Sequence, residues 1–191
     1  MTNYHHITYS PIIEHNKNLW LIDVRKNGVY LAQMNSMLDQ LEAVLTHYSQ
    51  VLVVRFDIGL RYITQGNEPI RAIFESLLRY IQRTYKISNI GYHWVREQEK
   101  SKKQHYHCVL MLDANKIRHP SKLNDFILKL EDTHHVRPWI PKNCFYRFKR
   151  NELNIKQGAI IRMSYLAKGR GKGYKPTQVK NHSSSRVKPK C

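Results

Sequence analysis

The chain has 191 residues, which is enough for one domain with a real hydrophobic core and a tail, and too few for a helicase motor or a polymerase as well. It carries 32 Lys and Arg residues against 14 Asp and Glu residues, so its net charge is +18. Such a charge attracts polyanions, of which nucleic acid is the commonest and a membrane surface the alternative. No stretch approaches the roughly 20 apolar residues that are needed to span a bilayer.

The cysteines and the N-terminal segment bear on the compartment. Three cysteines are scattered along the chain without CxxC spacing, which argues against a disulfide framework or a zinc finger. The first ten residues, MTNYHHITYS, show no charged segment followed by an apolar run, so no secretion signal is expected. These features favour a protein of the reducing cytoplasm.

Strand and helix signals alternate along the chain. Strands are expected at 19–24, 51–58, 89–97, 105–112 and 144–148, and helices at 34–49, 67–81, 121–130 and 157–169. The polar segment between the third and fourth strands predicts a β-hairpin over 89–112. From residue 51 onward the order β-α-β-β-α-β-α suits an antiparallel sheet that is covered by helices, so the expected fold class is α+β.

The chain is expected to have three parts. Residues 1–50 are expected to form an N-terminal element that packs on or adjoins the main domain, 51–169 to form that domain, and 170–191 to form a basic flexible tail. The tail is rich in Gly, Pro, Ser and Lys, and no acidic residue follows Glu152. It cannot bury enough apolar surface to order itself and is expected to be disordered in isolation.

The hairpin carries a candidate metal site. His105 and His107 stand one residue apart in an apolar strand, so their side chains point to the same face. Glu97 precedes the turn and would lie close to His105 across the ladder. Two imidazoles and a carboxylate suit Mn²⁺ or Mg²⁺, with further positions for water and phosphate oxygens. The alternative is a pair of surface histidines, and Glu99 is a rival ligand.

Tyr165 and Lys168 are a candidate nucleophile and cation, because residues three apart on a helix share a face. A phenol, whose ordinary pKa is about 10, needs a nearby metal-bound phosphate or cation to attack efficiently at pH 7. Lys168 could stabilise the phenolate or the transition-state phosphate. The alternative is a half-buried core tyrosine, since Ile160 and Ile161 precede it, with a solvated lysine.

Other residues are candidates for nucleic-acid contacts. Arg55 and Asp57 share one strand face, so Arg55 could contact phosphate and Asp57 could orient a ligand, although an ordinary Arg–Asp pair fits equally well. Phosphate contacts that do not read sequence are also expected from the tail cations Arg170, Lys172 and Lys175. Three strand aromatics could stack on bases or belong to the core: Tyr92, Trp94 and Tyr106.

Three segments, in order over about residues 51–169, resemble motifs of the HUH endonucleases. The His-hydrophobic-His motif of that family resembles HYHCVL, and the metal-binding hairpin of its replication-initiator branch resembles REQEKSKKQHYHCVLML. The Tyr-x-x-Lys nucleophile motif of that branch resembles SYLAKG, and VLVVRFDIGL stands in the place of its first strand. The whole pattern is most similar to the inovirus gene II-like initiators of filamentous phages and related prophages.

The resemblance implies a fold, a site and a reaction. The fold would be a HUH or Rep-type domain, ferredoxin-like or RRM-like, with a central metal-binding hairpin. His105, His107 and Glu97 would hold Mn²⁺ or Mg²⁺, Tyr165 would attack the scissile phosphate, and Lys168 would assist. The products would be a 5′-phosphotyrosine link and a free 3′-OH that primes rolling-circle replication. The partners would be single-stranded or hairpin origin DNA, a separate helicase and the replication machinery.

The chain departs from a two-tyrosine pattern. Ile161 and Gly169 stand one helical turn from Tyr165, so a single-tyrosine enzyme is expected, with Tyr174 a conceivable second tyrosine. Two alternatives remain open: a transposase or relaxase with the same site, and a non-catalytic nucleic-acid-binding protein that relies on its charge. A membrane-surface role is less favoured, because the basic residues do not line one face of an apolar-backed helix.

Overall fold

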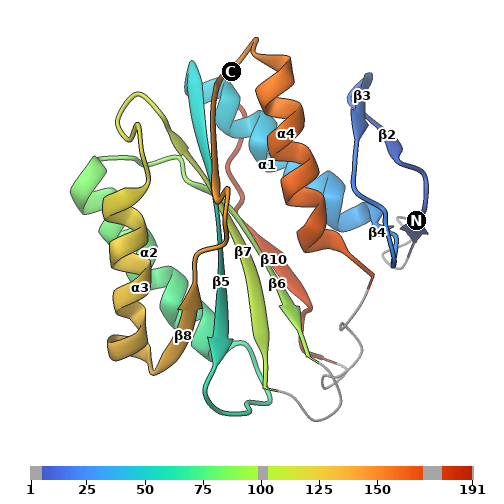
Figure 1. Ribbon diagram of the computed structural model, residues 1–191. Helices are drawn as coiled ribbons and strands as arrows, with labels where there is room; N and C mark the ends of the chain where they lie inside the picture. Colours follow the sequence, from blue (N-terminus) through green and yellow to red (C-terminus); the bar gives the residue numbers. More distant parts are fainter. Residues whose placement is uncertain (1–5, 99–102, 170–177, 191) are drawn as a thin grey trace.

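The computed structural model, which describes residues 6–98, 103–169 and 178–190, is built around a six-stranded antiparallel sheet (Figure 1). The strand order is β10-β6-β7-β5-β8, and β9 also pairs with β5. The strands are β5 (Gln50–Leu60), β6 (Gly91–Glu97), β7 (His105–Asp113), β8 (Val136–Trp139), β9 (Phe145–Lys149) and β10 (His182–Ser184). Two smaller pairs precede the sheet in sequence: β1 (Ile7–Thr8) with β4 (Val29–Tyr30), and β2 (Ile12–His15) with β3 (Asn18–Leu21).

Helices cover both faces of the sheet, and the expected α+β class is confirmed (Figure 1). The described part of the chain contains four α-helices: α1 (Leu31–His47), α2 (Glu68–Tyr85), α3 (Ser121–His134) and α4 (Leu153–Ser164). The 3₁₀ turn η1 (Tyr165–Ala167) follows α4 directly. None of the helices among the described residues is long and apolar enough to cross a bilayer.

The strand β5 divides the core in two. Its even-numbered side chains pack with α2 and α3, while Val51 and Val53 pack with α1 and α4 on the opposite face. Because both faces are covered, β5 has a continuous apolar sequence rather than an alternating one. Arg55 and Asp57 follow on the α1 and α4 face, so the strand carries charged groups to the place where α4 ends.

The predicted helices and strands are present with shifted bounds, but no strand was predicted at β1, β2, β4, β8 or β10. The hairpin of β6 and β7 is present with Glu97 opposite His105. The last predicted helix begins four residues earlier than expected, at Leu153, and its α-helical part ends at Ser164. Tyr165 therefore lies in η1, a tighter turn, rather than inside an α-helix.

The expectation of a flexible tail is wrong for residues 182–184. They form β10, which pairs with β6 and occupies the edge of the sheet. Beyond it, the backbone N–H of Lys190 donates to Thr46 Oγ1 on α1 at 2.7 Å. Backbone hydrogen bonds hold this segment in place. A composition that is poor in apolar residues gives no sign of such pairing. Tail residues that lie outside the described ranges include Arg170, Lys172, Tyr174 and Lys175, and Glu99 lies outside them too.

Candidate active site

The central strand β7 brings two histidines between two carboxylates. In the register of the sheet, Asp57 on β5 is opposite His107, and Glu97 on β6 is opposite His105. Residues that pair across antiparallel strands project to the same face. The four side chains therefore converge on the α1 and α4 face from three neighbouring strands.

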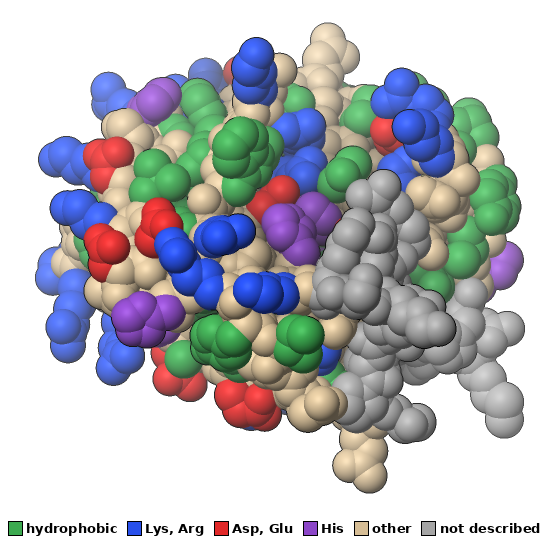
Figure 2. Space-filling view, turned by 60° about the horizontal axis from the view of Figure 1, so that its bottom comes forward, with side chains coloured by type: hydrophobic (Ala, Val, Ile, Leu, Met, Phe, Trp, Pro, Cys, Tyr) green, Lys and Arg blue, Asp and Glu red, His purple; other side chains and the backbone are tan. Residues whose placement is uncertain are grey.

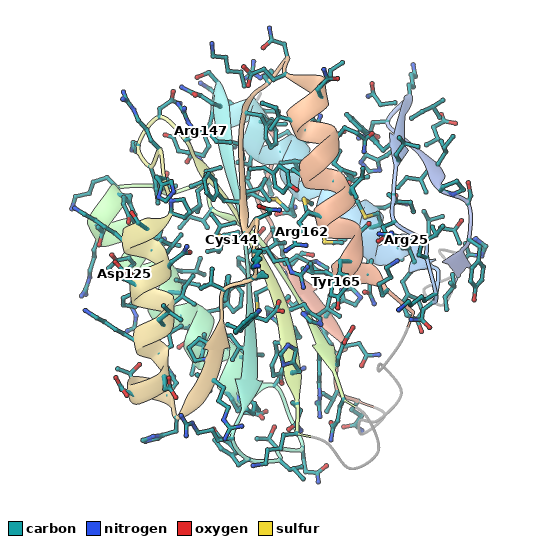
Figure 3. All side chains as sticks on the ribbon, viewed as in Figure 1. Arg25, Asp125, Cys144, Arg147, Arg162 and Tyr165 are labelled. Atoms are coloured by element: carbon teal, nitrogen blue, oxygen red, sulfur yellow. The ribbon has the colours of Figure 1, made fainter. Side chains whose placement is uncertain are left out.

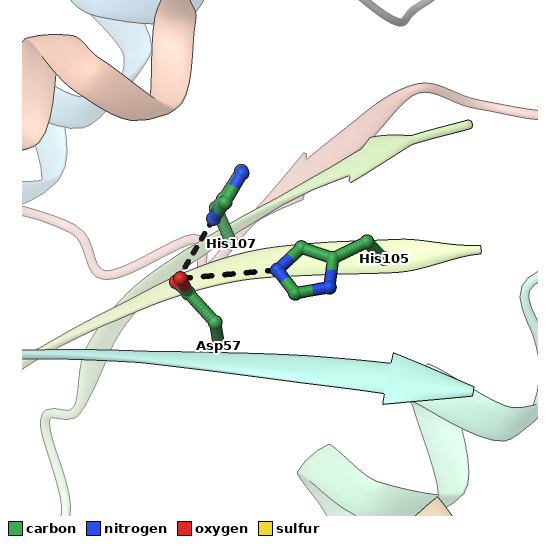
Figure 4. A group of neighbouring side chains, drawn as sticks. All are labelled: Asp57, His105 and His107. Carbon is green, nitrogen blue, oxygen red and sulfur yellow. Dashed lines mark ion pairs between the residues drawn. The ribbon is translucent and has the colours of Figure 1, made fainter. Parts of the chain in front are cut away.

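The distances define a cluster around Asp57 (Figure 4). Its Oδ1 lies 2.9 Å from Nδ1 of His107, and its Oδ2 lies 3.8 Å from Nε2 of His105. Glu97 approaches the other side of the His107 ring, with Oε2 at 3.2 Å from Nε2. Asp57 and His107 are buried, whereas the side chain of His105 is 42% exposed and open to a ligand from solvent.

This cluster fits a divalent cation. One ligand atom from each of Asp57, His105 and His107 can be chosen so that all lie within 4.8 Å of one another. Oδ1 of Asp57 and Nδ1 of His107 are both buried and face each other. Ligand atoms that share an octahedral cation at about 2.1 Å lie about 3 Å apart, close to the observed 2.9 Å. Two imidazoles and a carboxylate form a donor set that suits Mn²⁺ and related metals.

The charges of the cluster support one another. Burial raises the pKa of Asp57, but the hydrogen bonds from His105 and His107 and the charges of His107 and Arg55 hold it well below its usual range. Burial lowers the pKa of His107, but the hydrogen bonds and charges of Asp57 and Glu97 more than offset this and raise it above the ordinary 6.5. When no metal is bound, the two carboxylates therefore stabilise a positive charge between them, and the protonated ring of His107 supplies that charge.

Metal binding should consequently depend on pH. An imidazole must be neutral to bind a metal ion, so protons compete with the metal at His107. Because the pKa of this ring is raised, we expect Mn²⁺ affinity to be full above the raised pKa and to fall about tenfold per pH unit below it. Calorimetric titration from about pH 8 down to about pH 6 tests this. A flat affinity over that range would contradict the assignment of His107 as a ligand.

Tyr165 stands beside the cluster at the C-terminal end of α4 (Figure 3). Its ring centroid lies 5.4 Å from that of His107, with the two rings nearly perpendicular. The guanidinium carbon of Arg55 lies 4.2 Å from the tyrosine ring centroid, and the same guanidinium is 3.4 Å from Asp57. A buried cation thus connects the tyrosine to the cluster, and 36% of the tyrosine remains exposed.

Lys168 has a different environment from the one the sequence suggested. Its Nζ binds the carboxylate and the carbonyl oxygen of Asp23 and lies 2.9 Å from the carbonyl oxygen of Arg25. It is 7% exposed. It therefore holds the segment before β4 against η1. A pocket of about 350 Å³ beside this contact is lined by Asp23, Arg25, Lys26, Asn27, Glu97, Tyr165 and Lys168.

The contact of Lys168 predicts an effect on stability. Replacing Lys168 with Ala leaves a partly buried Asp23 carboxylate without its inner cation, so we expect a loss of about 3 kcal/mol in the free energy of unfolding. Arg25→Ala is the matched control, because Arg25 pairs with the same carboxylate from an 85% exposed position and its loss should matter much less. Urea unfolding measures both. Equal small effects would show that the buried contact contributes little.

Sequence reasoning identified most of the cluster but gave Asp57 a secondary role. It assigned the third ligand to Glu97, whereas Asp57 is the carboxylate that lies near both imidazoles. The sequence feature that could have pointed to Asp57 as a ligand was an aspartate inside a continuous apolar strand, on the same face as Arg55. Two of the aromatics that might have stacked on bases, Trp94 and Tyr106, are buried in the core against α2 and α3.

The fold and the site together define an α+β protein that carries a His/Asp cluster on one face of an antiparallel sheet. The family model of the YagK/YfjJ C-terminal domain matches residues 13–184, and the chain belongs to this family. Comparisons with curated proteins and with solved structures found no match. The description of this family does not name a HUH endonuclease, so the HUH relationship stays a prediction.

Proposed function

We propose that this chain is a metal-dependent, single-tyrosine DNA-nicking and strand-joining endonuclease of the HUH type, which initiates rolling-circle replication. The observation that carries the proposal is the contact of Tyr165 with the cluster, where its ring lies 5.4 Å from that of His107. A histidine pair alone, or a half-exposed tyrosine alone, does not indicate this function, because both are common. A tyrosine packed against a candidate metal ligand is a much narrower arrangement.

In this proposal Asp57, His105 and His107 hold the cation, and Glu97 fixes the His107 ring from its other side. When bound, Mn²⁺ or Mg²⁺ supplies Lewis-acid polarisation of the scissile phosphate. The half-exposed His105 marks the side from which phosphate enters. The buried Asp57 and His107 keep their positions without rearrangement, because the strands on either side hold them.

Tyr165 is the nucleophile. Its phenolic oxygen forms a bond to phosphorus, the bond from phosphorus to the 3′-oxygen breaks, and the net transfer of the phenolic proton is to the leaving 3′-oxygen. The 5′ end stays attached to the tyrosine. The energy of the phosphodiester is retained in this link, so the reverse attack by a 3′-OH rejoins a strand without ATP.

Arg55 takes the electrostatic role that the sequence suggested for Lys168. Its guanidinium lies over the tyrosine ring and beside Asp57, so it can both orient the ring and offset negative charge that develops nearby. The ammonium of Lys168 is directed at Asp23 and two carbonyl oxygens. Lys168 then acts on the nucleophile indirectly, by holding η1 in place.

The substrate would be single-stranded or hairpin origin DNA, because a nucleophile packed against a sheet requires a locally melted strand. Unwinding would fall to a separate helicase, and the reaction would take place in the cytoplasm. The direct test is incubation with Mn²⁺ and a pool of single-stranded and hairpin DNA, followed by denaturation and a search for a protein band shifted by attached DNA. A His105→Ala variant should form no such adduct. Absence of an adduct from any DNA would favour a non-catalytic binding protein.

A further inference from the structure

The edge strand β8 continues the row of site residues across the sheet. Trp139 is directly opposite Asp57, which is itself opposite His107, so all three side chains lie on the same face. Trp139 is 61% exposed, whereas the other two tryptophans, Trp20 and Trp94, are 5% and 4% exposed. A large aromatic group therefore lies at the surface one strand away from the cluster.

A basic residue accompanies this tryptophan. Arg137, two residues earlier on β8, is exposed and opposite Gly59, which is opposite His105. Gly59 places no side chain of its own between His105 and Arg137. A Cβ at this position would lie 3.6 Å from Nδ1 of His105. Figure 2 shows histidine side chains reaching the surface beside a carboxylate, with Lys and Arg side chains around them.

We propose that Trp139 and Arg137 form a binding site for a nucleotide of single-stranded DNA, with the indole stacked on the base and the guanidinium paired with a phosphate. This inference rests on the proposed function, whose scissile phosphate would lie one strand away at the cluster. Tyr165 and its pocket lie toward β6, and Trp139 lies toward the opposite edge. A strand bound at both places crosses the sheet over the histidines.

The chemistry of the surface favours single-stranded nucleic acid over a protein partner. The face of an aromatic ring stacks on any base, but a base offers its own face only when it is unpaired. The neighbouring cation and the net charge of +18 favour a polyanion. The register places both side chains in line with the candidate ligands, as expected for a substrate that passes over the cluster.

Fluorescence provides a direct readout, because the exposed tryptophan is the one that a base can reach. The full-length protein, in EDTA so that no cleavage occurs, is titrated with oligothymidylate of about 10 nucleotides and with an abasic deoxyribose-phosphate oligomer of equal length. We expect oligothymidylate to quench the emission and the abasic oligomer to leave it nearly unchanged. Trp139→Phe should remove the quenching and keep most of the affinity, which also shows that the fold tolerates the change.

The alanine variants separate stacking from charge. Trp139→Ala should weaken oligothymidylate binding about 5- to 150-fold and leave the abasic oligomer unaffected. Arg137→Ala should weaken both oligomers equally and lower the salt dependence by about one phosphate. Leu128→Ala and Arg79→Ala, exposed positions on α3 and α2, are matched controls that should bind like the parent protein.

Two results would overturn the inference: no quenching by oligothymidylate, or unchanged binding by Trp139→Ala, which would instead favour a protein partner for this surface. A different result would rule out the proposed function. Base-dependent quenching without any covalent adduct in Mn²⁺ would leave the stacking site in place and remove the nuclease assignment. Adduct formation together with unchanged affinity in Trp139→Ala would support the nuclease assignment and remove the stacking site.

Discussion

Replacing Tyr165 with Phe is expected to abolish nicking and covalent attachment, a loss of at least about 10³-fold, because the variant has no nucleophile. Binding of single-stranded DNA should change by less than about twofold. The phenylalanine keeps the ring that packs 5.4 Å from the His107 ring and lies under the guanidinium of Arg55. The measurement is the yield of denaturation-resistant adduct, with oligonucleotide affinity determined in parallel.

The matched control is Tyr9→Phe, which removes a phenolic oxygen from a tyrosine that is 68% exposed. It should form adducts at the parental rate. If Tyr165→Phe retained adducts while its affinity was unchanged, another residue would be the nucleophile, and the assignment of Tyr165 would be wrong.

The second large effect is expected at Asp57. Replacing it with Asn removes the carboxylate that lies near both imidazoles, so Mn²⁺ affinity and nicking should fall at least about 100-fold. Glu97→Gln should cost less, about 10- to 100-fold, because Glu97 contacts the His107 ring and would act mainly by orienting it. Calorimetric titration with Mn²⁺ measures the affinities.

Asp125→Asn is the control for these variants, since Asp125 is an exposed carboxylate on α3, away from the cluster (Figure 3). It should bind Mn²⁺ as the parent protein does. A larger loss in Glu97→Gln than in Asp57→Asn would reverse the two roles and restore the ligand set that the sequence alone suggested.

Local patterns were enough to predict the hairpin and its histidines. Alternation along an apolar strand places His105 and His107 on one face, and the short polar segment before them sets Glu97 opposite His105, as the register shows. The same alternation placed Arg55 and Asp57 together, and they do pair at 3.4 Å. These features depend on residues that are close in sequence.

The remaining features depend on how distant segments meet. Asp57 reaches His107 only because β5 and β7 pair in one particular register, although they are about 50 residues apart in sequence. The ammonium of Lys168 turns to Asp23 because the segment before β4 packs on η1. Trp139 gains its place beside Asp57 through the pairing of β8 with β5. Neither periodicity nor composition carries this information.

The measurement that tests the central claim most directly is mass spectrometry of the adduct formed with Mn²⁺ and single-stranded DNA. After protease and nuclease digestion, we predict a 5′-nucleotide on the peptide that contains Tyr165, attached through a phosphodiester to the phenolic oxygen. Omission of the metal or the change Asp57→Asn should remove this species. A nucleotide on another residue, or DNA cleavage without any protein-linked product, would contradict the account.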